Sequence, residues 1–172
     1  MTAPTTDHPA RIVAALVRAR VTVAASLPDS WLTPVIDRVD STGTIRHVRV
    51  TREDDGVGVC AGAALMSARS VLVCQNAGVL LSANALAGYG NHHQLPFVVI
   101  AADRGRAGDN FHYQAYKHSA TAGVVRALGL RVHTLDTEDD LDLVTAAFDE
   151  ADMTRRPVVL LCSKRALQGI PA

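Results

Sequence analysis

Six short runs of apolar, often β-branched residues constrain the fold of this chain more than any other feature. They occupy residues 21–26, 44–50, 71–75, 96–102, 131–135 and 157–163, with helix-like segments between them. Several are apolar almost throughout, which is typical of strands buried on both faces. Parallel strands need a crossover connection, usually a helix. The pattern therefore predicts an α/β fold that is doubly wound, with a mostly parallel six-stranded sheet and helices on both faces.

The length indicates a single domain, because 172 residues can form one core of ordinary size. We expect a short disordered lead over residues 1–8 and one α/β domain over residues 9–172. The lead has neither a basic start nor an apolar run, so we expect no signal peptide. Balanced charge, with 17 basic and 17 acidic residues, and only 4% aromatic residues argue against a nucleic-acid partner.

Two further features bear on the compartment. Asp, Glu, Lys and Arg are absent between Arg69 and Asp103, but amides, histidines, serines and a proline interrupt this stretch too often for a membrane span. The three cysteines, Cys60, Cys74 and Cys162, are odd in number and far apart, which argues against a disulfide framework. We expect a cytoplasmic protein.

In a sheet of this kind, ligands bind where the strands' carboxyl ends lead into helices. The sequence therefore predicts that ligand-binding residues lie in the loops 26–31, 51–57, 75–82 and 102–118. The second runs into "GVGVCAG" (56–62), which opens the following helix and suggests a dinucleotide-binding interpretation. That interpretation fails, because the next strand ends in Gln75 rather than an acid, and because three acids directly before the glycines would repel a pyrophosphate.

Those acids are Glu53, Asp54 and Asp55. Asp54 and Asp55 are explained by a helix start, where carboxylates accept free N–H bonds and suit the positive end of the helix dipole. Glu53 follows an apolar strand, so we expect it to end that strand at the carboxyl edge of the sheet. A carboxylate in that position can take part in proton chemistry.

Several stretches, in a fixed order, resemble one known family. They are "LPDSWLTPVID" (27–37), "REDDGVGVCAGAALMSA" (52–68), "CQNAGVLLSANAL" (74–86) and "QLPFVVIAADRG" (94–105). Together they are similar to the pyrimidine-binding domain of thiamine diphosphate-dependent 2-oxoacid decarboxylases. Among these, they most resemble the α subunit of sulfopyruvate decarboxylase and the N-terminal half of phosphonopyruvate decarboxylase. The order and spacing hold from about residue 20 to residue 165, which makes the combination specific.

The resemblance implies a definite role for Glu53, nine positions before Gly62. In the family this glutamate hydrogen-bonds the cofactor's aminopyrimidine ring, and so promotes loss of the thiazolium proton. The activated cofactor then attacks a 2-oxoacid, carbon dioxide leaves, and protonation releases an aldehyde. The implied cofactor is thiamine diphosphate.

Other site residues are also implied by the resemblance. Asp29 and Ser30 match a loop that faces the reacting carbon, and Ser30 aligns with an acid that transfers protons in some relatives. One of the two could equally cap a helix beginning near Trp31. The matching turn that lines the cofactor pocket is Asn76, Ala77 and Gly78.

The family's loop after the fourth strand is only partly retained, in "ADRGRAGDNFHYQAYKH" (102–118). Its histidine aligns with neither His112 nor His118 clearly, and both are candidates for proton handling or anion binding. Arg104, together with Arg106 and Lys117, could pair with a substrate sulfonate or phosphonate, or be simply solvated. His92 and His93 lack further ligands at metal-binding spacing, so we predict no metal site in this chain.

Half of the family's cofactor site has no counterpart in the sequence. The Gly-Asp-Gly and later Asn that hold Mg²⁺ and the diphosphate are absent. We therefore expect a β subunit that carries these ligands, with the cofactor shared in a hetero-oligomer, α2β2 or larger. The expected activity is decarboxylation of a 3-sulfopyruvate- or 3-phosphonopyruvate-like substrate.

Two alternatives to this activity stay open. Leu80 and Leu81 stand where the family has a glycine and a polar residue, and a drier pocket would favour a carboligase. The chain could also be a non-catalytic scaffold subunit of the same fold.

Overall fold

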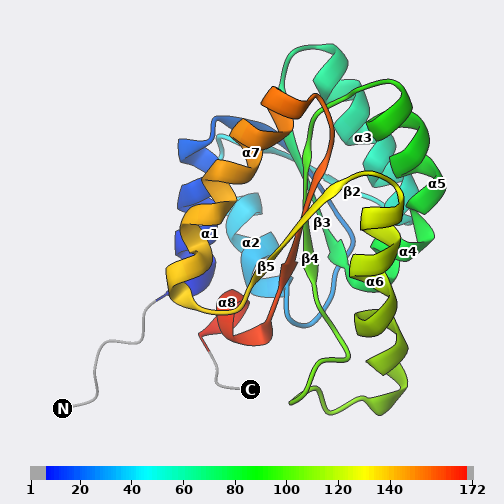
Figure 1. The fold of residues 1–172 in the computed structure, drawn as a ribbon. Helices are drawn as coiled ribbons and strands as arrows, with labels where there is room; N and C mark the ends of the chain where they lie inside the picture. The colour runs from blue at the N-terminus through cyan, green and yellow to red at the C-terminus, as the bar shows by residue number, and fades with distance from the viewer. Residues whose placement is uncertain (1–6, 170–172) are drawn as a thin grey trace.

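A computed structural model describes residues 7–169. All six strands are parallel, in the spatial order β2-β1-β3-β4-β6-β5. Their bounds are β1 (Val21–Ser26), β2 (Arg46–Arg49), β3 (Arg69–Gln75), β4 (Val98–Ala102), β5 (Arg131–Leu135) and β6 (Val158–Cys162). Each lies within or close to one of the six apolar runs, so the predicted doubly wound α/β fold is confirmed (Figure 1).

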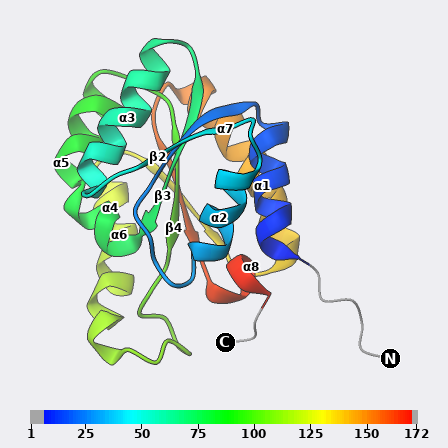
Figure 2. The ribbon, with the colours of Figure 1, turned by 180° about the vertical axis from the view of Figure 1, so that it is seen from behind.

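Helices cover both faces of the sheet, as Figures 1 and 2 show from opposite sides. On one face lie α1 (His8–Arg18), α2 (Thr33–Ser41), α7 (Asp142–Thr154) and the short α8 (Lys164–Gln168). On the other lie α3 (Glu53–Leu65), α4 (Asn76–Leu81), α5 (Ala83–Ala85), the π-helix η1 (Leu86–His92) and α6 (Ala115–Ala127). Two short 3₁₀ helices, η2 (His112–Gln114) and η3 (Glu138–Leu141), precede α6 and α7.

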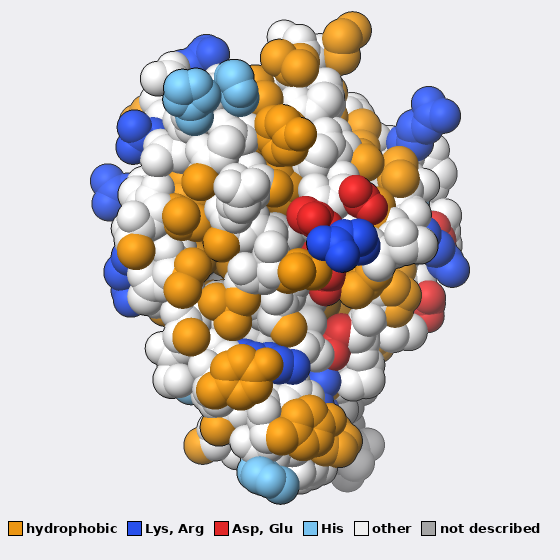
Figure 3. Space-filling model, turned by 90° about the vertical axis from the view of Figure 1, so that its right-hand side faces the viewer, with side chains coloured by type: hydrophobic (Ala, Val, Ile, Leu, Met, Phe, Trp, Pro, Cys, Tyr) orange, Lys and Arg blue, Asp and Glu red, His pale blue; other side chains and the backbone are white. Residues whose placement is uncertain are grey.

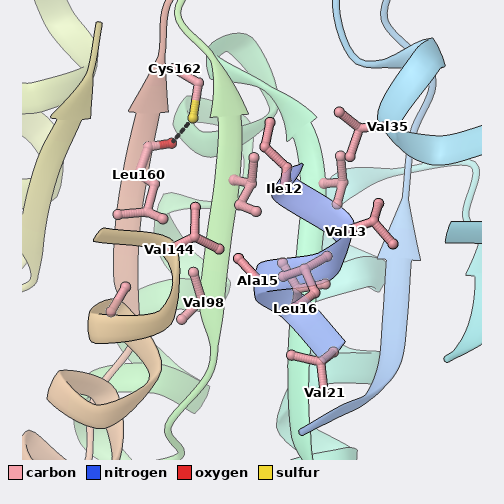
Figure 4. Packing of buried hydrophobic residues seen from close by; sticks show 14 of the residues in the cluster. Ile12, Val13, Ala15, Leu16, Val21, Val35, Val98, Val144, Leu160 and Cys162 are labelled. Carbon is pink, nitrogen blue, oxygen red and sulfur yellow. Dashed lines mark hydrogen bonds between the residues drawn. The ribbon is translucent and has the colours of Figure 1, made fainter. Parts of the chain in front are cut away.

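The core is divided by the sheet into two clusters, because successive strand residues point to opposite faces. In β3, Val71 and Val73 pack with α1 and α2, whereas Leu72 and Cys74 pack under α3 and α4. Figure 4 shows the first cluster, in which side chains of α1, α2 and α7 meet those of the central strands. Burial on both faces explains why the central strands read as continuous apolar runs.

The domain begins slightly earlier than the predicted residue 9. Asp7 caps α1 by accepting a hydrogen bond from the backbone of Ala10, and His8 is buried and bonded to the carbonyl of Ala166. The remainder of the expected lead, residues 1–6, lies outside the described residues. Within the described range, every helix is too short or too polar to cross a bilayer.

The winding creates a crevice at the carboxyl ends of two neighbouring strands. β1 leads into α2 on one face, and its neighbour β3 leads directly into α4 on the other. Connections that leave adjacent strands in opposite directions open a crevice between them, where ligands of α/β proteins bind. The loops named from the sequence converge on this edge.

Candidate active site at the carboxyl edge of the sheet

Glu53 begins α3 rather than ending a strand, which corrects the sequence interpretation, since β2 stops at Arg49. Its side chain is only 8% exposed. Asp54 and Asp55 complete an acidic first turn, as predicted. Asp54 is paired with Arg52 through two bonds of 3.0 Å, so Glu53 alone of the three acids is directed into the protein.

The Glu53 side chain lies directly against the backbone of Gly78, near the start of α4. A Cβ atom added to Gly78 would sit 2.3 Å from Glu53 Cγ and 2.6 Å from Oε1, closer than real contacts allow. Any larger residue at position 78 would therefore displace the Glu53 side chain. Burial, and then the negative charge of Glu53, raise the pKa of the Cys74 thiol at the end of β3.

Asn76, the first residue of α4, ties this turn to the loop after β4. Its Nδ2 donates to the carbonyl of Arg104 at 2.8 Å and to Asp103 Oδ1 at 3.3 Å. Its Oδ1 is buried and has no hydrogen-bond partner among the described residues. A buried acceptor without a donor is costly, and is commonly satisfied by a ligand or water. Ala77 lies beside it, partly buried.

Arg104 is the centre of a buried ion-pair network at this edge. Its guanidinium is 4% exposed, and Nη1 donates to Asp29 Oδ2 at 2.9 Å. Nε and Nη2 donate to the two carboxylate oxygens of Asp109 at 2.8 and 3.2 Å. The guanidinium also stacks on the Trp31 ring, 4.5 Å from its centroid. The sequence suggested that Arg104 could bind a substrate anion directly. Its N–H donors are already occupied by the carboxylates of Asp29 and Asp109.

Asp29 and Ser30 occupy the loop after β1. Asp29 Oδ1 accepts a hydrogen bond from the backbone of Trp31 at 2.9 Å, so it stabilises the turn into α2 while Oδ2 pairs with Arg104. The Ser30 hydroxyl lies 3.4 Å from Arg104 Nη1. Ser30 is exposed, and lines a hollow of about 220 Å³ with Trp31 and Phe111.

Two polar residues of this network, Gln75 and Gln114, were not identified as site residues from the sequence. Gln75, the last residue of β3, donates from Nε2 to Asp29 Oδ2 at 2.9 Å. Its Oε1 accepts from Lys117 Nζ at 3.0 Å, and Gln114 Oε1 accepts from the same ammonium at 3.3 Å. The signal for Gln75 was present, because a polar residue ending a buried parallel strand lies at the ligand-binding edge.

The structure separates the two candidate histidines. His118 Nδ1 lies 3.0 and 3.1 Å from the carboxylate oxygens of Asp103, whose side chain is 2% exposed. His118 itself is 46% exposed, so the other side of its ring faces outward. His112, in η2, is exposed and contacts the ring of Tyr113, and no hydrogen bond joins it to the network in the described part of the chain.

Four further residues named from the sequence, Leu80, Leu81, His92 and His93, lie at the ends of α4 and η1. Leu81 is 52% exposed and Leu80 is partly buried, so Leu81 lies at the surface of the domain. His92 and His93 lie at the end of η1 and are exposed. Within residues 7–169, there is no group of three or more His, Cys, Asp or Glu side chains able to hold a metal ion.

A comparison with solved structures supports the fold. The chain superposes with a TM-score of 0.72 on 2-oxoglutarate:ferredoxin oxidoreductase from Magnetococcus marinus, solved with 2-oxoglutarate, coenzyme A and succinyl-CoA bound. The match covers 95% of this chain and 30% of that one, at 12% identity. At this identity the likeness concerns the fold alone. No family model matches the sequence.

Comparison with curated proteins identifies relatives. The chain is 32% identical over 128 residues to the α subunit of sulfopyruvate decarboxylase from Methanothermobacter thermautotrophicus, covering 74% of this chain and 78% of that protein. It is 34% identical over 140 residues to phosphonopyruvate decarboxylase from Streptomyces viridochromogenes, covering 80% of this chain but 35% of that protein. The resemblance found in the sequence motifs is confirmed, and the chain belongs to the family of sulfopyruvate decarboxylase α subunits and phosphonopyruvate decarboxylases.

Proposed function

We propose that this chain is the pyrimidine-binding α subunit of a two-subunit, thiamine diphosphate-dependent decarboxylase of 3-sulfopyruvate or 3-phosphonopyruvate. The observation that carries the proposal is Glu53, a buried carboxylate packed on Gly78 at the crevice of the sheet. The family supports decarboxylation, because the relatives are decarboxylases of these two substrates by name.

The residues around Glu53 fit the aminopyrimidine of this cofactor. The carboxylate of Glu53 is buried against Gly78 and paired with no cation among the described residues, a position in which it can share a proton with a ring nitrogen. The unpartnered Oδ1 of Asn76, two residues before Gly78, offers a second acceptor, and we assign Ala77 and Gly78 to the wall of the pocket. When bound, thiamine diphosphate supplies the carbon nucleophile and the electron sink that decarboxylation of a 2-oxoacid requires.

Decarboxylation of a 2-oxoacid consumes one proton, because the carboxylate leaves as carbon dioxide and the carbonyl carbon gains hydrogen to form an aldehyde. His118 is the group that we assign to this transfer. Asp103 holds Nδ1, which fixes the ring orientation and leaves Nε2 to carry the proton. His112 has no such partner among the described residues, and Ser30, whose hydroxyl lies 3.4 Å from Arg104 Nη1, is the other candidate at this edge.

For Arg104 we propose a positioning role. Its two carboxylate partners, Asp29 and Asp109, come from different loops, and a guanidinium between them holds both loops in one arrangement. Ser30 and the loop that leads to His118 are thereby placed at the same edge of the sheet.

The relatives named as α subunits support a partner subunit for this chain. The face formed by α3, α4, η1 and α6 carries mainly apolar and uncharged side chains (Figure 3). Its exposed large residues are Leu65, Met66, Leu81, Tyr89 and Tyr116. We propose that a β subunit packs on this face in an α2β2 or larger assembly, and brings the Mg²⁺ and diphosphate ligands. The three buried, reduced cysteines suit the cytoplasm.

The test is reconstitution with the β subunit, thiamine diphosphate and Mg²⁺, followed by product analysis. We expect 3-sulfopyruvate or 3-phosphonopyruvate to yield carbon dioxide and the corresponding aldehyde, and Glu53→Gln to reduce turnover to near background. A C–C coupled product, formed when an acceptor aldehyde is present, would identify a carboligase instead. Calorimetry that detects no cofactor binding to the complex would leave only the scaffold alternative.

A further inference from the structure

The sequence offers three cations near the substrate loops, and two of them are neutralised within the chain. Arg104 is buried between Asp29 and Asp109. Arg106 is paired with Asp136 and lies 3.6 Å from Asp103. A guanidinium that already faces two carboxylates has little charge left for a ligand.

Lys117 differs from both arginines. Its ammonium is held by two neutral acceptors, the amide oxygens of Gln75 and Gln114, at 3.0 and 3.3 Å. No carboxylate lies within 4.0 Å of it among residues 7–169. Lys117 is partly buried, so its charge is neither fully solvated nor neutralised. Two of its three N–H groups are used, and the third remains for a ligand.

Lys117 also lies on the same side of the sheet as Glu53. It belongs to α6, which packs on α4 on the face covered by α3 (Figure 1). Gln75, which holds its ammonium, is three residues before Gly78, on which Glu53 packs. Gln75 is also bonded to Asp29, beside Ser30. Lys117 is therefore joined by direct hydrogen bonds to the loops of the candidate site.

A second unpaired lysine provides a comparison. Lys164 has no ion-pair partner in the described part of the chain, and lines the hollow that contains Ser30. It belongs to α8, however, which lies with α1 and α7 on the opposite face of the sheet from Glu53 (Figure 1). The position relative to Glu53 favours Lys117.

We propose that Lys117 binds the tetrahedral anion on C3 of the substrate, a sulfonate or phosphonate, and so selects these 2-oxoacids over those that lack an anion on C3. The inference rests on the proposed decarboxylase function. Gln75 and Gln114 orient the ammonium without neutralising it, which preserves its attraction for a second anionic group. Specificity here comes from one charge-assisted contact that a substrate without the C3 anion cannot make.

The experiment compares Lys117→Met with Lys164→Met in the reconstituted complex, using 3-sulfopyruvate, 3-phosphonopyruvate and pyruvate. For Lys117→Met we expect kcat/KM to fall about 10- to 100-fold for the substrates with a C3 anion, and to stay within about two-fold for pyruvate. Lys117→Arg, which keeps the charge but not its compact shape, should retain part of the discrimination.

Binding is measured separately from turnover, by calorimetry of the complex with 3-sulfopropanoate and with butanoate. We expect Lys117→Met to weaken only the binding of 3-sulfopropanoate. Equal losses for pyruvate and 3-sulfopyruvate, or loss of selectivity in Lys164→Met alone, would overturn the assignment while leaving decarboxylation intact. A wild-type complex without decarboxylase activity would overturn the proposed function, and this inference with it.

Discussion

Arg104 is the residue on which the shape of the candidate site depends most. Replacing it with methionine leaves the buried carboxylates of Asp29 and Asp109 without a cationic partner. Breaking a buried ion pair in this way costs about 3–5 kcal/mol, because an uncompensated charge remains in the interior. We expect Arg104→Met to lower the free energy of unfolding by that amount, measured by urea denaturation.

The surface ion pair between Arg38 and Asp7 is the matched control, because its side chains are 44% and 49% exposed. Arg38→Met should cost at most about 1 kcal/mol. Similar losses for the two variants would show that the Arg104 network contributes no more than a surface pair.

Asp109 makes the same network sensitive to acid. Burial opposes its ionisation, but hydrogen bonds from Arg104 and the Gly105 backbone hold the pKa of this carboxyl below the ordinary value of 3.8. A group with a lowered folded-state pKa stabilises the fold above its unfolded pKa, and this stability is lost as pH falls through the folded value.

Asp109→Asn should therefore be less stable than the wild type at pH 7, and the difference in Tm should shrink as pH falls below about 3.8. Thermal unfolding followed by circular dichroism between pH 7 and pH 2.5 measures it. A constant difference across that range would contradict the assignment of the lowered pKa to Asp109.

At the scale of elements, the site depends on the close approach of α3 and α4. In Gly78→Ala the new methyl group would lie 2.3–2.6 Å from atoms of Glu53, which must then move. We expect a loss of turnover of about 100-fold, as for other small misplacements of a catalytic group, with intact secondary structure. Steady-state kinetics and circular dichroism check this.

Gly123→Ala in α6 is the control for this substitution, because its Cβ would meet nothing within 4 Å. It should stabilise the helix by roughly 0.5–1 kcal/mol and leave turnover unchanged. Comparable activity in the two variants would argue that Glu53 tolerates displacement from Gly78.

The elements themselves were largely predictable, for a physical reason. A strand buried on both faces must be apolar at successive positions, so β3, β4 and β6 are visible in the sequence. The first turn of α3 was visible from its acids, although Glu53 proved to begin the helix rather than end a strand. The π-helix η1 was not predicted, since its hydrogen-bond pattern leaves no clear signal in "LAGYGNH".

Only the site residues that belong to short continuous motifs could be predicted from the sequence. The resemblance of short motifs to the family identified Glu53, Asn76 and Gly78 as candidates, and these residues lie at one edge of the sheet. Which cation is neutralised could not be known, because Arg104 meets Asp29 across 75 positions of the chain. For the same reason, only the structure distinguishes His118, fixed by Asp103, from His112.

At the scale of the whole molecule, we propose that the partner subunit covers the face shown in Figure 3. Leu81 and Tyr89 are exposed there, and a charge at either position would be buried without a partner in the complex. We expect Tyr89→Asp to weaken association with the β subunit at least 10-fold, measured by analytical ultracentrifugation. Met153→Asp, on the exposed side of α7, should leave association unchanged, and the reverse result would move the interface to the other face.

The central claim is that Glu53 activates the cofactor. It is tested most directly by exchange of the thiazolium proton for deuterium in the reconstituted complex, followed by quenched-flow NMR. We expect Glu53→Gln to slow this exchange by about 10²- to 10⁴-fold. Asp54 pairs with Arg52 at the surface, so Asp54→Asn should exchange like the wild type. Exchange at the wild-type rate in Glu53→Gln would contradict the account.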